Sequence, residues 1–463
     1  MSRAARGMIE RQDLIERIER DEIETIVTAL PDLYGRLVGK RIHGPFFVDE
    51  VLDNGIHVCD YLLACDMEMD PTPGYAYTSW EKGYGDLLGL PDLDTLRVAA
   101  WLPRSAIVLC DAVAEGGNAL IEVAPRTILR RQIERAASMG LAPLMASELE
   151  FFLFHDDYAT AHEKGYRDLT KSQHYVEDYH VLSSAFAEPL IGEIRRQIDA
   201  SGVPVEFSKG EWGPGQHEIN LRYGRALEMA DRHVIYKLAA KEIADAAGCS
   251  LTFMAKVDES LAGSSCHVHM SLQDADGEPA FPGSGRLAGV PAPVSDTFRW
   301  FLGGLLRYSR ELTCLFAPNV NSYKRFRPGT FAPTAVAWSY DNRTTGFRVV
   351  GRGASIRVES RMPGADVNPY LTYAAMLAAG LEGVDQCLEP EPMFEGDAYG
   401  AERLAQLPTN LRDSVAALER SEFARKAFGD EVVDHILHFA RTELSVFDTL
   451  VTDAERARFF ERI

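Results

Sequence analysis

The stretch MASELEFFLF, residues 145–154, places glutamates at positions 148 and 150 on either side of a leucine. Successive side chains of a β-strand point to opposite faces of a sheet. Glu148 and Glu150 would therefore share one face, and Leu149 would lie on the other. The stretch predicts a strand with one charged face and one apolar face.

Three distant stretches repeat this pattern: HEINLRY at 217–223, CHVHMSL at 266–272 and IRVESRM at 356–362. Their polar side chains at alternate positions are Glu218, Asn220 and Arg222; His267, His269 and Ser271; and Arg357, Glu359 and Arg361. One such strand alone is typical of an ordinary sheet with a solvated face. Four of them predict a sheet whose polar face is built for chemistry.

Glutamates gathered on one face repel one another, by roughly 4 kcal/mol per pair at a separation of about 4 Å and an effective dielectric constant near 20. Cations must offset this repulsion. Carboxylates with a single imidazole suit Mg²⁺ or Mn²⁺ better than zinc, whose sites favour His and Cys. Arginines on the same face suit an anionic phosphate or carboxylate. The residues alone predict a metal-dependent site for a phosphorylated ligand.

Composition excludes several other classes of protein. The chain has 463 residues, with 48 Lys+Arg against 69 Asp+Glu and a formal net charge of −21. Without a basic run, this balance argues against nucleic acid and anionic membranes as partners. No segment resembles a signal peptide or a membrane-spanning helix. The seven cysteines lack C-x-x-C spacing, so we expect reduced thiols and a cytoplasmic protein.

The length exceeds a typical single core of roughly 250 to 300 residues, so we expect two domains. Gly116 and Gly117 interrupt the pattern before a helix that would begin at Pro125, which places the boundary near residue 120. Before it, residues 24–42 predict two strands joined by a turn, next to a helix over 8–23. After it, helical patterns cover 126–139, 181–200, 225–247, 295–313, 369–384 and much of 400–463.

Taken in order, the motifs resemble those of the glutamine synthetase superfamily. They are SELEFFLF, EWGPGQHEIN, GSSCHVH, NSYKRFRPG, DNRTTGFR, IRVESRMP and ADVNPYLTYAAMLAAGLEG. The resemblance implies an α+β fold, with a small N-terminal β-grasp domain over residues 1–120. A large catalytic domain over 121–463 would hold an antiparallel sheet funnel and C-terminal helices. It also implies a ring-shaped homo-oligomer, such as a dodecamer, with active sites between neighbouring subunits.

The resemblance also implies roles for single residues. Two or three metal ions per site, Mg²⁺ or Mn²⁺, would be held by two sets of ligands: Glu150, Glu211 and Glu218, and Glu148, His267 and Glu359. ATP would be bound by Glu206, Tyr223, His269, Ser271, Arg343, Arg348 and Arg357. Glutamate would be bound by Gly263, Arg325 and Arg361. Each arginine, Arg348 above all, has the alternative role of a structural partner for the glutamates.

The family joins glutamate to ammonia in two steps. ATP phosphorylates the γ-carboxylate, and ammonia then attacks the acyl phosphate. Metal ions and arginines would neutralise the charge that moves with the phosphoryl group. Catalytic roles in this chemistry are expected for Arg343, Arg325 and Asp60.

Two departures from the family pattern concern the nucleophile. In ammonia-using members a glutamate in the loop after the NSYKR motif takes a proton from ammonium, whereas RFRPGTFAP, residues 325–333, has Phe331 there. A phenyl ring cannot act as a general base, but it can line a pocket for an alkyl group. In VCDYLL the aspartate is kept as Asp60, while Tyr61, Leu62 and Leu63 replace Gly-Ser-Ser. Near the glutamate, Ala262 replaces an asparagine.

These departures favour a γ-glutamylamine ligase, which would join glutamate to a small organic amine such as ethanolamine. The alternatives are a glutamine synthetase with a rearranged ammonium site, in which Phe331 is only loop drift, or a ligase specific for polyamines. A non-catalytic relative is a further alternative, although the intact metal and arginine positions argue against it. The identity of the amine stays open at this stage.

Overall fold

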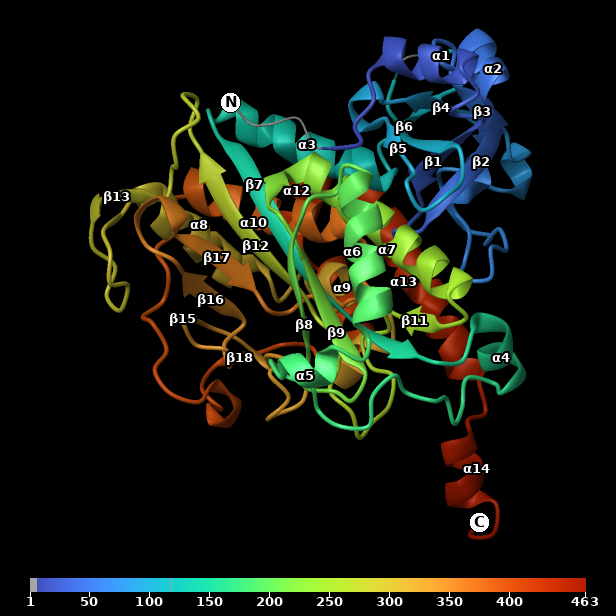
Figure 1. Ribbon diagram of the computed structural model, residues 1–463. Coiled ribbons are helices and arrows are strands. Elements are labelled where there is room, and N and C mark those ends of the chain that lie inside the picture. The colour runs from blue at the N-terminus through green and yellow to red at the C-terminus, as the bar shows by residue number, and fades with distance from the viewer. Residues whose placement is uncertain (1–5, 118) are drawn as a thin grey trace.

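A computed structural model describes residues 6–117 and 119–463, and it contains two large sheets (Figure 1). The first sheet uses strands from residues 25–114, and the second uses strands from residues 142–360. A short two-stranded sheet joins β14 (Ala335–Val336) to β18 (Ala405–Gln406), and β13 covers Pro282–Gly285. The domain boundary near residue 120 stays a prediction, and it falls between the two large sheets.

The first sheet has the strand order β2-β1-β6-β4-β3, with β5 beside β6. Its strands are β1 (Thr25–Pro31), β2 (Leu37–His43), β3 (Ile56–Cys59), β4 (Asp86–Pro91), β5 (Arg97–Val98) and β6 (Ser105–Ala114). The strands β1 and β2 form the predicted hairpin, and β1 runs parallel to β6. A helical segment of α2 (Gly44–Phe46) and a π-helical turn (Phe47–Val51) connects β2 to β3, while α1 (Arg11–Glu19) precedes the sheet. The order and the parallel central pair match the expected β-grasp arrangement.

The second sheet has the strand order β15-β16-β17-β12-β7-β9-β8, with β10 and β11 also paired to β7. Its strands are β7 (Ala142–Phe154), β8 (Val205–Gly210), β9 (Gln216–Leu221), β10 (Gly224–Arg225), β11 (Ser250–Thr252), β12 (Cys266–Gln273), β15 (Trp338–Tyr340), β16 (Phe347–Val350) and β17 (Arg357–Ser360). All neighbouring strands are antiparallel except β15 and β16. The four strands with alternating polar residues, β17, β12, β7 and β9, are consecutive neighbours.

Helices pack against the apolar face of the second sheet and form the main core (Figure 1). They include α3 (Pro125–Ser138), α7 (Ala226–Ala246), α8 (Asp296–Tyr308) and α10 (Pro369–Asp385). Leu149, Val268 and Val358, the apolar residues between the polar ones, are at most 1% exposed. Removing this much apolar surface from water fixes which face of each strand is buried and which is left for the site.

The other helices are α4 (Tyr158–Glu163), α5 (Val181–Ser184), α6 (Glu188–Ala200), α9 (Thr313–Phe316), α11 (Leu411–Glu419), α12 (Glu422–Phe428), α13 (Asp430–Thr449) and α14 (Asp453–Phe459). The helix predicted over 181–200 was wrong as one element, because the chain forms α5 and then α6. Pro189, in the first turn of α6, explains the break, since proline is tolerated there and cannot continue a preceding helix. The helix predicted over 295–313 is likewise divided into α8 and α9.

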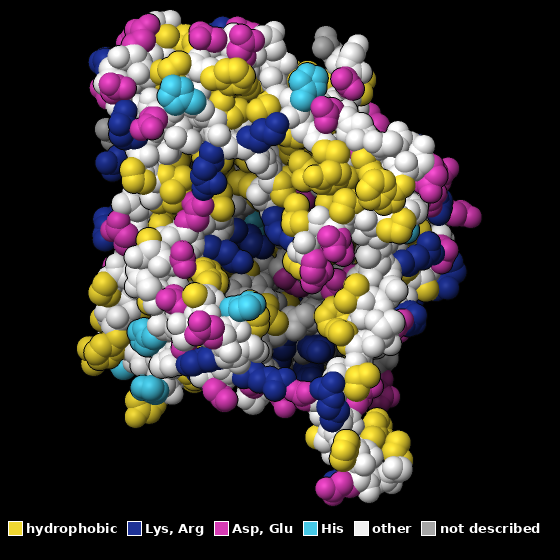
Figure 2. Space-filling view, turned by 90° about the vertical axis from the view of Figure 1, so that its right-hand side faces the viewer, with side chains coloured by type: hydrophobic (Ala, Val, Ile, Leu, Met, Phe, Trp, Pro, Cys, Tyr) yellow, Lys and Arg dark blue, Asp and Glu magenta, His cyan; other side chains and the backbone are white. Residues whose placement is uncertain are grey.

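The C-terminal helix α14 projects from the body of the molecule and carries hydrophobic side chains (Figures 1 and 2). Phe459, Phe460 and Ile463 are 42%, 86% and 97% exposed. Figure 2 also shows basic, acidic and apolar side chains interspersed over the rest of that face. Within the described residues, no helix has the length and apolar character needed to cross a bilayer.

A buried arginine connects the first sheet to helices α3 and α7. Arg126 at the start of α3 is 2% exposed, and its guanidinium donates to Asp92 (2.7 Å) and Asp111 in the first sheet and its edge. The same guanidinium donates to Asp231 of α7 at 3.0 and 3.1 Å, and Asp231 also accepts from the Tyr370 hydroxyl at 2.6 Å. One cation therefore serves three acids from separate elements.

We expect Arg126→Ala to lower the free energy of unfolding by about 3 to 5 kcal/mol, because it leaves the buried Asp231 carboxylate without its ion-pair partner. The matched control is Arg131→Ala on the same helix. Arg131 pairs with Glu122 at 2.5 Å, but both side chains are more than 40% exposed, so its loss should cost less than about 1 kcal/mol. Denaturant titration followed by tryptophan fluorescence measures both. Equal losses in the two variants would contradict a structural role for the buried cluster.

Candidate functional site

Cross-strand pairing brings the predicted acids into three neighbouring rows on the polar face of the second sheet. In the first row Glu148 of β7 lies opposite His267 of β12. In the second row His269 of β12 lies opposite Glu359 of β17. In the third row Glu150 of β7 lies opposite Glu218 of β9. Residues directly opposite on neighbouring strands have Cβ atoms only about 5 Å apart. The predicted sharing of one face by these residues is confirmed.

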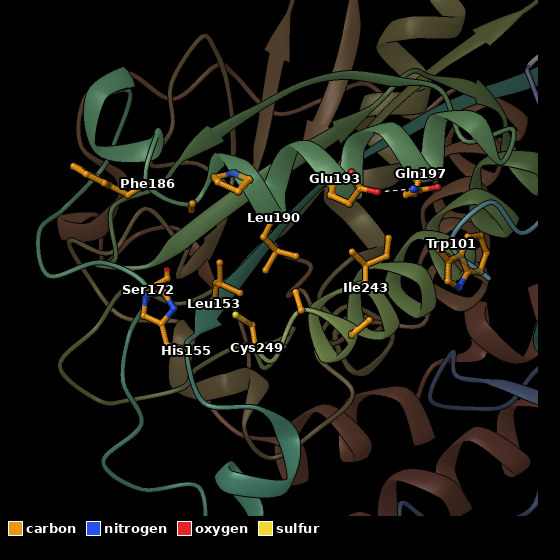
Figure 3. A pocket seen from close by; sticks show the side chains of 14 residues that line it. Trp101, Leu153, His155, Ser172, Phe186, Leu190, Glu193, Gln197, Ile243 and Cys249 are labelled. Atoms are coloured by element: carbon orange, nitrogen blue, oxygen red, sulfur yellow. Dashed lines mark hydrogen bonds between the residues drawn. The ribbon is translucent and has the colours of Figure 1, made fainter. Parts of the chain in front are cut away.

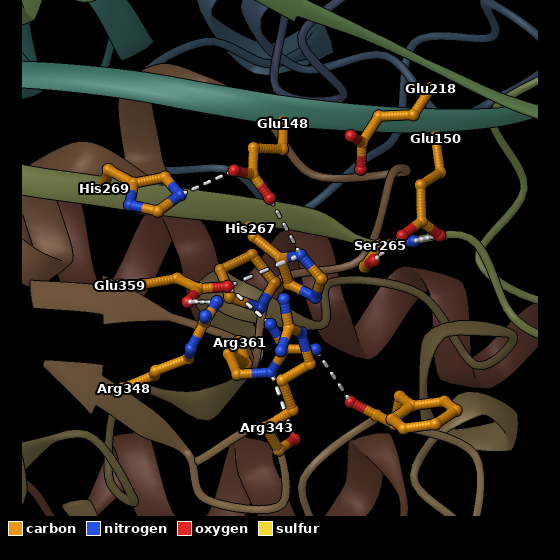
Figure 4. A network of polar contacts seen from close by, with 12 residues as sticks. Glu148, Glu150, Glu218, Ser265, His267, His269, Arg343, Arg348, Glu359 and Arg361 are labelled. Atoms are coloured by element: carbon orange, nitrogen blue, oxygen red, sulfur yellow. Dashed lines mark hydrogen bonds and ion pairs between the residues drawn. The ribbon is translucent and has the colours of Figure 1, made fainter. Parts of the chain in front are cut away.

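A cavity of about 550 Å³ opens over these rows. Its walls come from the sheet, from loops at 178–179, 211–212 and 260–263, and from the loop at 325–332. The residues that Figure 4 labels point toward one another across this space. Predicted site residues among its lining are Glu148, Glu150, Glu211, Glu218, Gly263, His267, Arg325, Phe331, Arg343, Arg348 and Arg361.

The first candidate metal cluster consists of Glu148, His267 and Glu359, whose possible ligand atoms all lie within 4.8 Å of one another. His267 Nδ1 is 3.3 Å from Glu148 Oε2 and 3.7 Å from Glu359 Oε1. Burial, reinforced by the charge of Arg361, lowers the pKa of His267 to about 4, so the imidazole is neutral as a metal ligand must be. Burial would raise the pKa of Glu359, but the charge of Arg361 lowers it to about 2.

The second candidate cluster groups Glu150 and Glu218 with the same His267. Burial and the charge of Glu211 raise the pKa of Glu150 to about 8, and burial with the charge of Glu148 raises that of Glu218. Glu150 accepts hydrogen bonds from the Ser265 amide (2.8 Å) and hydroxyl (2.5 Å). Because the pKa values of both buried carboxylates are raised, a cation bound between them would favour their ionised forms. Their oxygens, with one imidazole, fit a hard divalent ion.

Glu211, the predicted third ligand with Glu150 and Glu218, lines the same cavity. Its Oε1 accepts a hydrogen bond from Lys209, and the clustered ligand atoms include His267 in place of Glu211. Its role as a metal ligand stays a prediction. One of its two carboxylate oxygens is engaged by Lys209.

The predicted arginines differ in what they contact. Arg348 donates to Glu359 at 3.0 Å and to Asp341 at 2.5 Å, while Arg361 donates to Glu359 at 2.5 Å. The alternative role considered for Arg348, a structural partner of a glutamate, therefore describes its contacts here. Arg343 is exposed beside them in the cavity wall. These guanidinium groups concentrate positive charge opposite the glutamates.

Arg325 is 2% exposed and donates to three backbone carbonyls, those of Arg361 (2.8 Å), Met362 (2.9 Å) and Pro363 (3.0 Å). These bonds fix the loop that begins at Arg325 against the end of β17. Gly263 lies against it, since a Cβ there would come within 2.5 Å of Arg325 Cγ and 2.8 Å of the Ala255 carbonyl oxygen. Only glycine fits this position without a shift.

The remaining nucleotide candidates lie along the same strands, outside the lining of the 550 Å³ cavity. Arg357 Nε is 3.2 Å from His269 Nδ1, and His269 Nε2 is 2.9 Å from Glu148 Oε1. Ser271 follows on β12, and Glu206 and Tyr223 are exposed on and near β8 and β9. Asp60 belongs to the first sheet, where it accepts from the Thr78 hydroxyl at 2.7 Å. Asp60 does not line the cavity of its own chain.

Comparison with known proteins agrees with this geometry. A sequence profile of the glutamine synthetase catalytic domain matches residues 122–459. The chain is 49% identical over 453 residues to gamma-glutamylethanolamide synthetase GlnA4 of Streptomyces coelicolor, covering 98% of this chain and 96% of that protein. It is 34% identical to a glutamate–isopropylamine ligase of Pseudomonas sp., covering 96% and 97% of the two chains. A solved structure of GmaS without ligand matches with a TM-score of 0.84 at 28% identity, covering 97% of this chain and all of that one.

The chain belongs to the glutamine synthetase family. The expected family and fold class are thereby confirmed. The family uses ATP and divalent metal ions, and the two acid clusters, with their raised carboxylate pKa values, are suited to such ions. Metal ions held there would supply the positive charge that lets phosphate oxygens approach the carboxylates.

Phe331 is the residue predicted to replace the glutamate of ammonia-using family members, and that correspondence stays a prediction. It lies at the cavity wall, 51% exposed, with a φ of 58°, a backbone conformation that is uncommon for a bulky residue. Its ring makes an edge contact with Trp212, 6.2 Å between centroids, and its carbonyl accepts from Arg361 at 3.4 Å. Two aromatic rings therefore form one wall of the cavity.

Sequence reasoning did not single out several residues that line this cavity, among them Asp178, Tyr179, Lys209 and Trp212. Lys209 stands two positions before Glu211 and lies opposite Glu218, so the alternation used for the four strands could have found it. Asp178 and Tyr179 come from a loop with no sequence pattern, and no such signal existed for them.

A second cavity, of about 520 Å³, lies between α6, α7 and the end of β7 (Figure 3). Its lining is mostly apolar, with Leu153, Leu190 and Ile243 among the labelled side chains. Glu193 at its rim bonds to Gln197 at 2.5 Å and to Arg196 at 2.6 Å. Without a cluster of acids and imidazoles, this cavity is not suited to phosphoryl transfer.

We expect Mg²⁺ or Mn²⁺ to raise the thermal midpoint of the protein, because a cation relieves the repulsion among the buried acids. Glu150→Gln should abolish most of this increase. Glu193→Gln, which alters the apolar cavity, is the control and should keep it. Differential scanning fluorimetry with and without EDTA measures the shift, and an equal response of Glu150→Gln and the unmodified protein would contradict the assignment.

The same acids predict a pH dependence. The pKa of Glu150 rises from an ordinary value of 4.5 to about 8 in the metal-free fold, so between these values the folded state holds a proton that the unfolded chain releases. The contribution of Glu150 to the stability of the metal-free protein should therefore be lost as the pH rises from about 5 to 8, and it is measured as the difference between the unmodified protein and Glu150→Gln. Metal affinity should increase over the same range, because the carboxylate must lose its proton to bind. Denaturant titrations across this range, with Glu150→Gln as control, measure the slope.

Proposed function

We propose that this protein ligates the γ-carboxylate of glutamate to a small organic amine, such as ethanolamine, with ATP and through a γ-glutamyl phosphate. The names of two relatives, a gamma-glutamylethanolamide synthetase and a glutamate–isopropylamine ligase, support this choice. The observation that carries it is the aromatic wall of Phe331 and Trp212 next to the acidic cavity. The cavity thus combines groups for activating a carboxylate with an apolar surface for an alkyl group.

In the proposed first step, the γ-carboxylate of glutamate attacks the γ-phosphorus of ATP, and ADP leaves. Two or three Mg²⁺ or Mn²⁺ ions, held by the two acid clusters, would neutralise charge on the phosphate oxygens. Arg343 and Arg348 line the cavity where they can donate to the transferring phosphoryl group. Arg361, fixed by Glu359, and Gly263 are proposed to receive the amino acid. Arg325 is proposed to hold the loop in place through its three carbonyl contacts.

The rest of the nucleotide is proposed to lie along the outer ends of β8, β9 and β12. His269, Arg357 and Ser271 follow one another on the polar face there, and Glu206 and Tyr223 are exposed nearby. An exposed aromatic ring can stack on adenine, and polar groups can bind the ribose and phosphates. The acid clusters would then receive the phosphate end of ATP.

In the second step, the amine nitrogen attacks the acyl phosphate and phosphate leaves. The nitrogen must first lose a proton, and Phe331 cannot accept one. Asp60 of a neighbouring subunit is proposed to face the site, which would explain why it does not line the cavity of its own chain. A glutamine synthetase that uses ammonia remains the second candidate function, because the activating groups would be the same.

We expect phosphate release from ATP and glutamate to depend on ethanolamine or a small alkylamine more strongly than on ammonium or putrescine. Putrescine carries a second ammonium group, which an apolar wall cannot satisfy. A coupled assay for ADP with each nucleophile, in the presence and absence of EDTA, measures this. A preference for ammonium over every amine would favour glutamine synthetase instead.

Phe331→Glu should shift selectivity toward ammonia by a factor of about 5 to 150, because a partly solvated charge pair contributes roughly 1 to 3 kcal/mol. Turnover with the organic amine should fall, since the new charge would face its alkyl group. Phe331→Leu, which keeps an apolar side chain, is the matched control and should keep the amine preference. An unchanged ratio of amine to ammonium kcat/KM in Phe331→Glu would refute the role of Phe331.

We further propose that the chain forms a ring-shaped homo-oligomer in the cytoplasm. The exposed apolar side chains Phe459, Phe460 and Ile463, at the end of α14 and just beyond it, support self-association, because large exposed apolar side chains mark interaction sites. All seven cysteines are free, which agrees with a reducing compartment.

Removing residues 451–463 should weaken assembly, whereas Phe459→Tyr should leave it intact because the ring is kept. Light scattering after size-exclusion chromatography measures the mass of each protein. If the shortened protein still assembles with the same number of chains per particle, α14 has no role in assembly.

A further inference from the structure

The ammonium group of Lys209 lies inside the acidic cavity, at its edge strand. β8 pairs with β9 so that Lys209 is opposite Glu218, which in turn is opposite Glu150 on β7. The three ionisable side chains form one row across three strands, with the lysine at the end of the sheet. Its side chain is 17% exposed. A lysine this enclosed must have its charge satisfied by protein groups.

Three groups surround the Lys209 nitrogen. It donates to Glu211 Oε1, lies 3.6 Å from Asp178 Oδ1, and stands 4.3 Å from the centroid of the Tyr179 ring. Two carboxylates and an aromatic face are the groups with which proteins bind a primary ammonium ion. The ammonium group of Lys209 is therefore paired within the protein.

Backbone contacts hold this receptor in place. The Asp178 amide donates to the Glu211 carbonyl at 3.1 Å, which ties the loop of Asp178 and Tyr179 to the end of β8. Tyr179 has a φ of 59°, so its ring is directed over Lys209 from a backbone conformation that is uncommon for a tyrosine. The preceding Glu177 is fully buried beneath the loop. These features indicate a built arrangement of groups.

The receptor shares a wall with the proposed amine pocket. Glu211 is followed directly by Trp212, whose ring contacts Phe331. All three side chains and Lys209 line the same cavity. A nitrogen nucleophile that enters as a cation would meet the aromatic wall on one side and the receptor on the other.

We propose that Lys209 determines specificity by occupying, with its own ammonium group, the place in which an ammonium ion would otherwise bind. This inference rests on the proposed ligation of glutamate to an organic amine. Ammonium has no apolar part, so it depends on carboxylates and an aromatic face, and Lys209 already occupies them. An organic amine also packs its alkyl group against Phe331 and Trp212. Its affinity therefore depends less on the carboxylates and the aromatic face that Lys209 occupies.

Lys209→Met tests the inference, because methionine keeps most of the side-chain length and removes the charge. The kcat/KM for ammonium should rise at least tenfold over that of the unmodified protein, while kcat/KM for the organic amine should change less than threefold. Lys209→Arg keeps a cation in the receptor and should keep the original preference. Lys209→Gln provides a second neutral variant if Lys209→Met is poorly folded, as judged by its thermal midpoint.

Two results would overturn the inference. The first is an unchanged ratio of amine to ammonium kcat/KM in the neutral variants. The second is an equal loss of turnover with every nucleophile together with a raised KM for ATP, which would assign Lys209 to phosphate binding.

A binding measurement separates this inference from the proposed function. Line broadening of ¹⁵N-ammonium in NMR spectra, recorded without ATP, should occur with Lys209→Met and be absent with the unmodified protein and with Lys209→Arg. If the unmodified enzyme uses no organic amine, the proposed function is refuted. The binding measurement would then still test whether Lys209 excludes ammonium. Broadening by the unmodified protein equal to that by Lys209→Met would refute the role of Lys209 alone.

Discussion

The register of four neighbouring strands concentrates like charges, and the rest of the site is organised around that repulsion. Glu148, Glu150, Glu218 and Glu359 share one face of the second sheet. Acids this close together and this buried cannot all ionise without cations nearby. The surroundings respond in different ways. Arg361 and Arg348 keep Glu359 charged, while Glu150 and Glu218 have raised pKa values.

These differences in the pKa values of the acids divide the polar face into two regions. Around Glu359 the negative charge is balanced by protein groups, and this carboxylate is available as a ligand at all ordinary pH values. Around Glu150 the charge is balanced by protons until a cation arrives. The apolar layer of helices beneath the sheet makes this arrangement possible, because it prevents the strands from moving apart to relieve repulsion.

Alternation along single strands was enough to predict the sheet, its charged face and most of the acids. That succeeded because Leu149, Val268 and Val358 must be buried, and burial fixes the direction of their neighbours. The hairpin of β1 and β2 was predicted from its turn residues for the same kind of local reason. The division of residues 181–200 into two helices was also a local effect, at Pro189, and could have been predicted from that proline alone.

Contacts between distant segments could not be predicted in this way. The three carbonyls that Arg325 contacts, the contacts of Arg126 with both the first sheet and α7, and the closeness of Tyr179 to Lys209 depend on how distant segments pack together, which no local pattern specifies. The NSYKRFRPG motif predicted Arg325 as a residue of the site. It did not indicate that the guanidinium would hold the loop carrying Phe331 in place.

Strands and loops supply different groups to the cavity, which explains why some contacts were predictable and others were not. The groups proposed to activate the carboxylate project from paired strands, whose positions are fixed by hydrogen bonds on both sides. Of the groups proposed to select the nucleophile, Tyr179, Trp212 and Phe331 project from loops at the rim, and Lys209 lies on the edge strand β8. Loops tolerate substitution without disturbing the sheet beneath them. A change of nucleophile therefore requires changes only at the rim and the edge strand, whereas loss of activation would require changes in the buried central strands. A phenylalanine at the loop position 331, together with the five acids and one imidazole proposed as metal ligands, is the pattern that we expect of a ligase adapted to an organic amine.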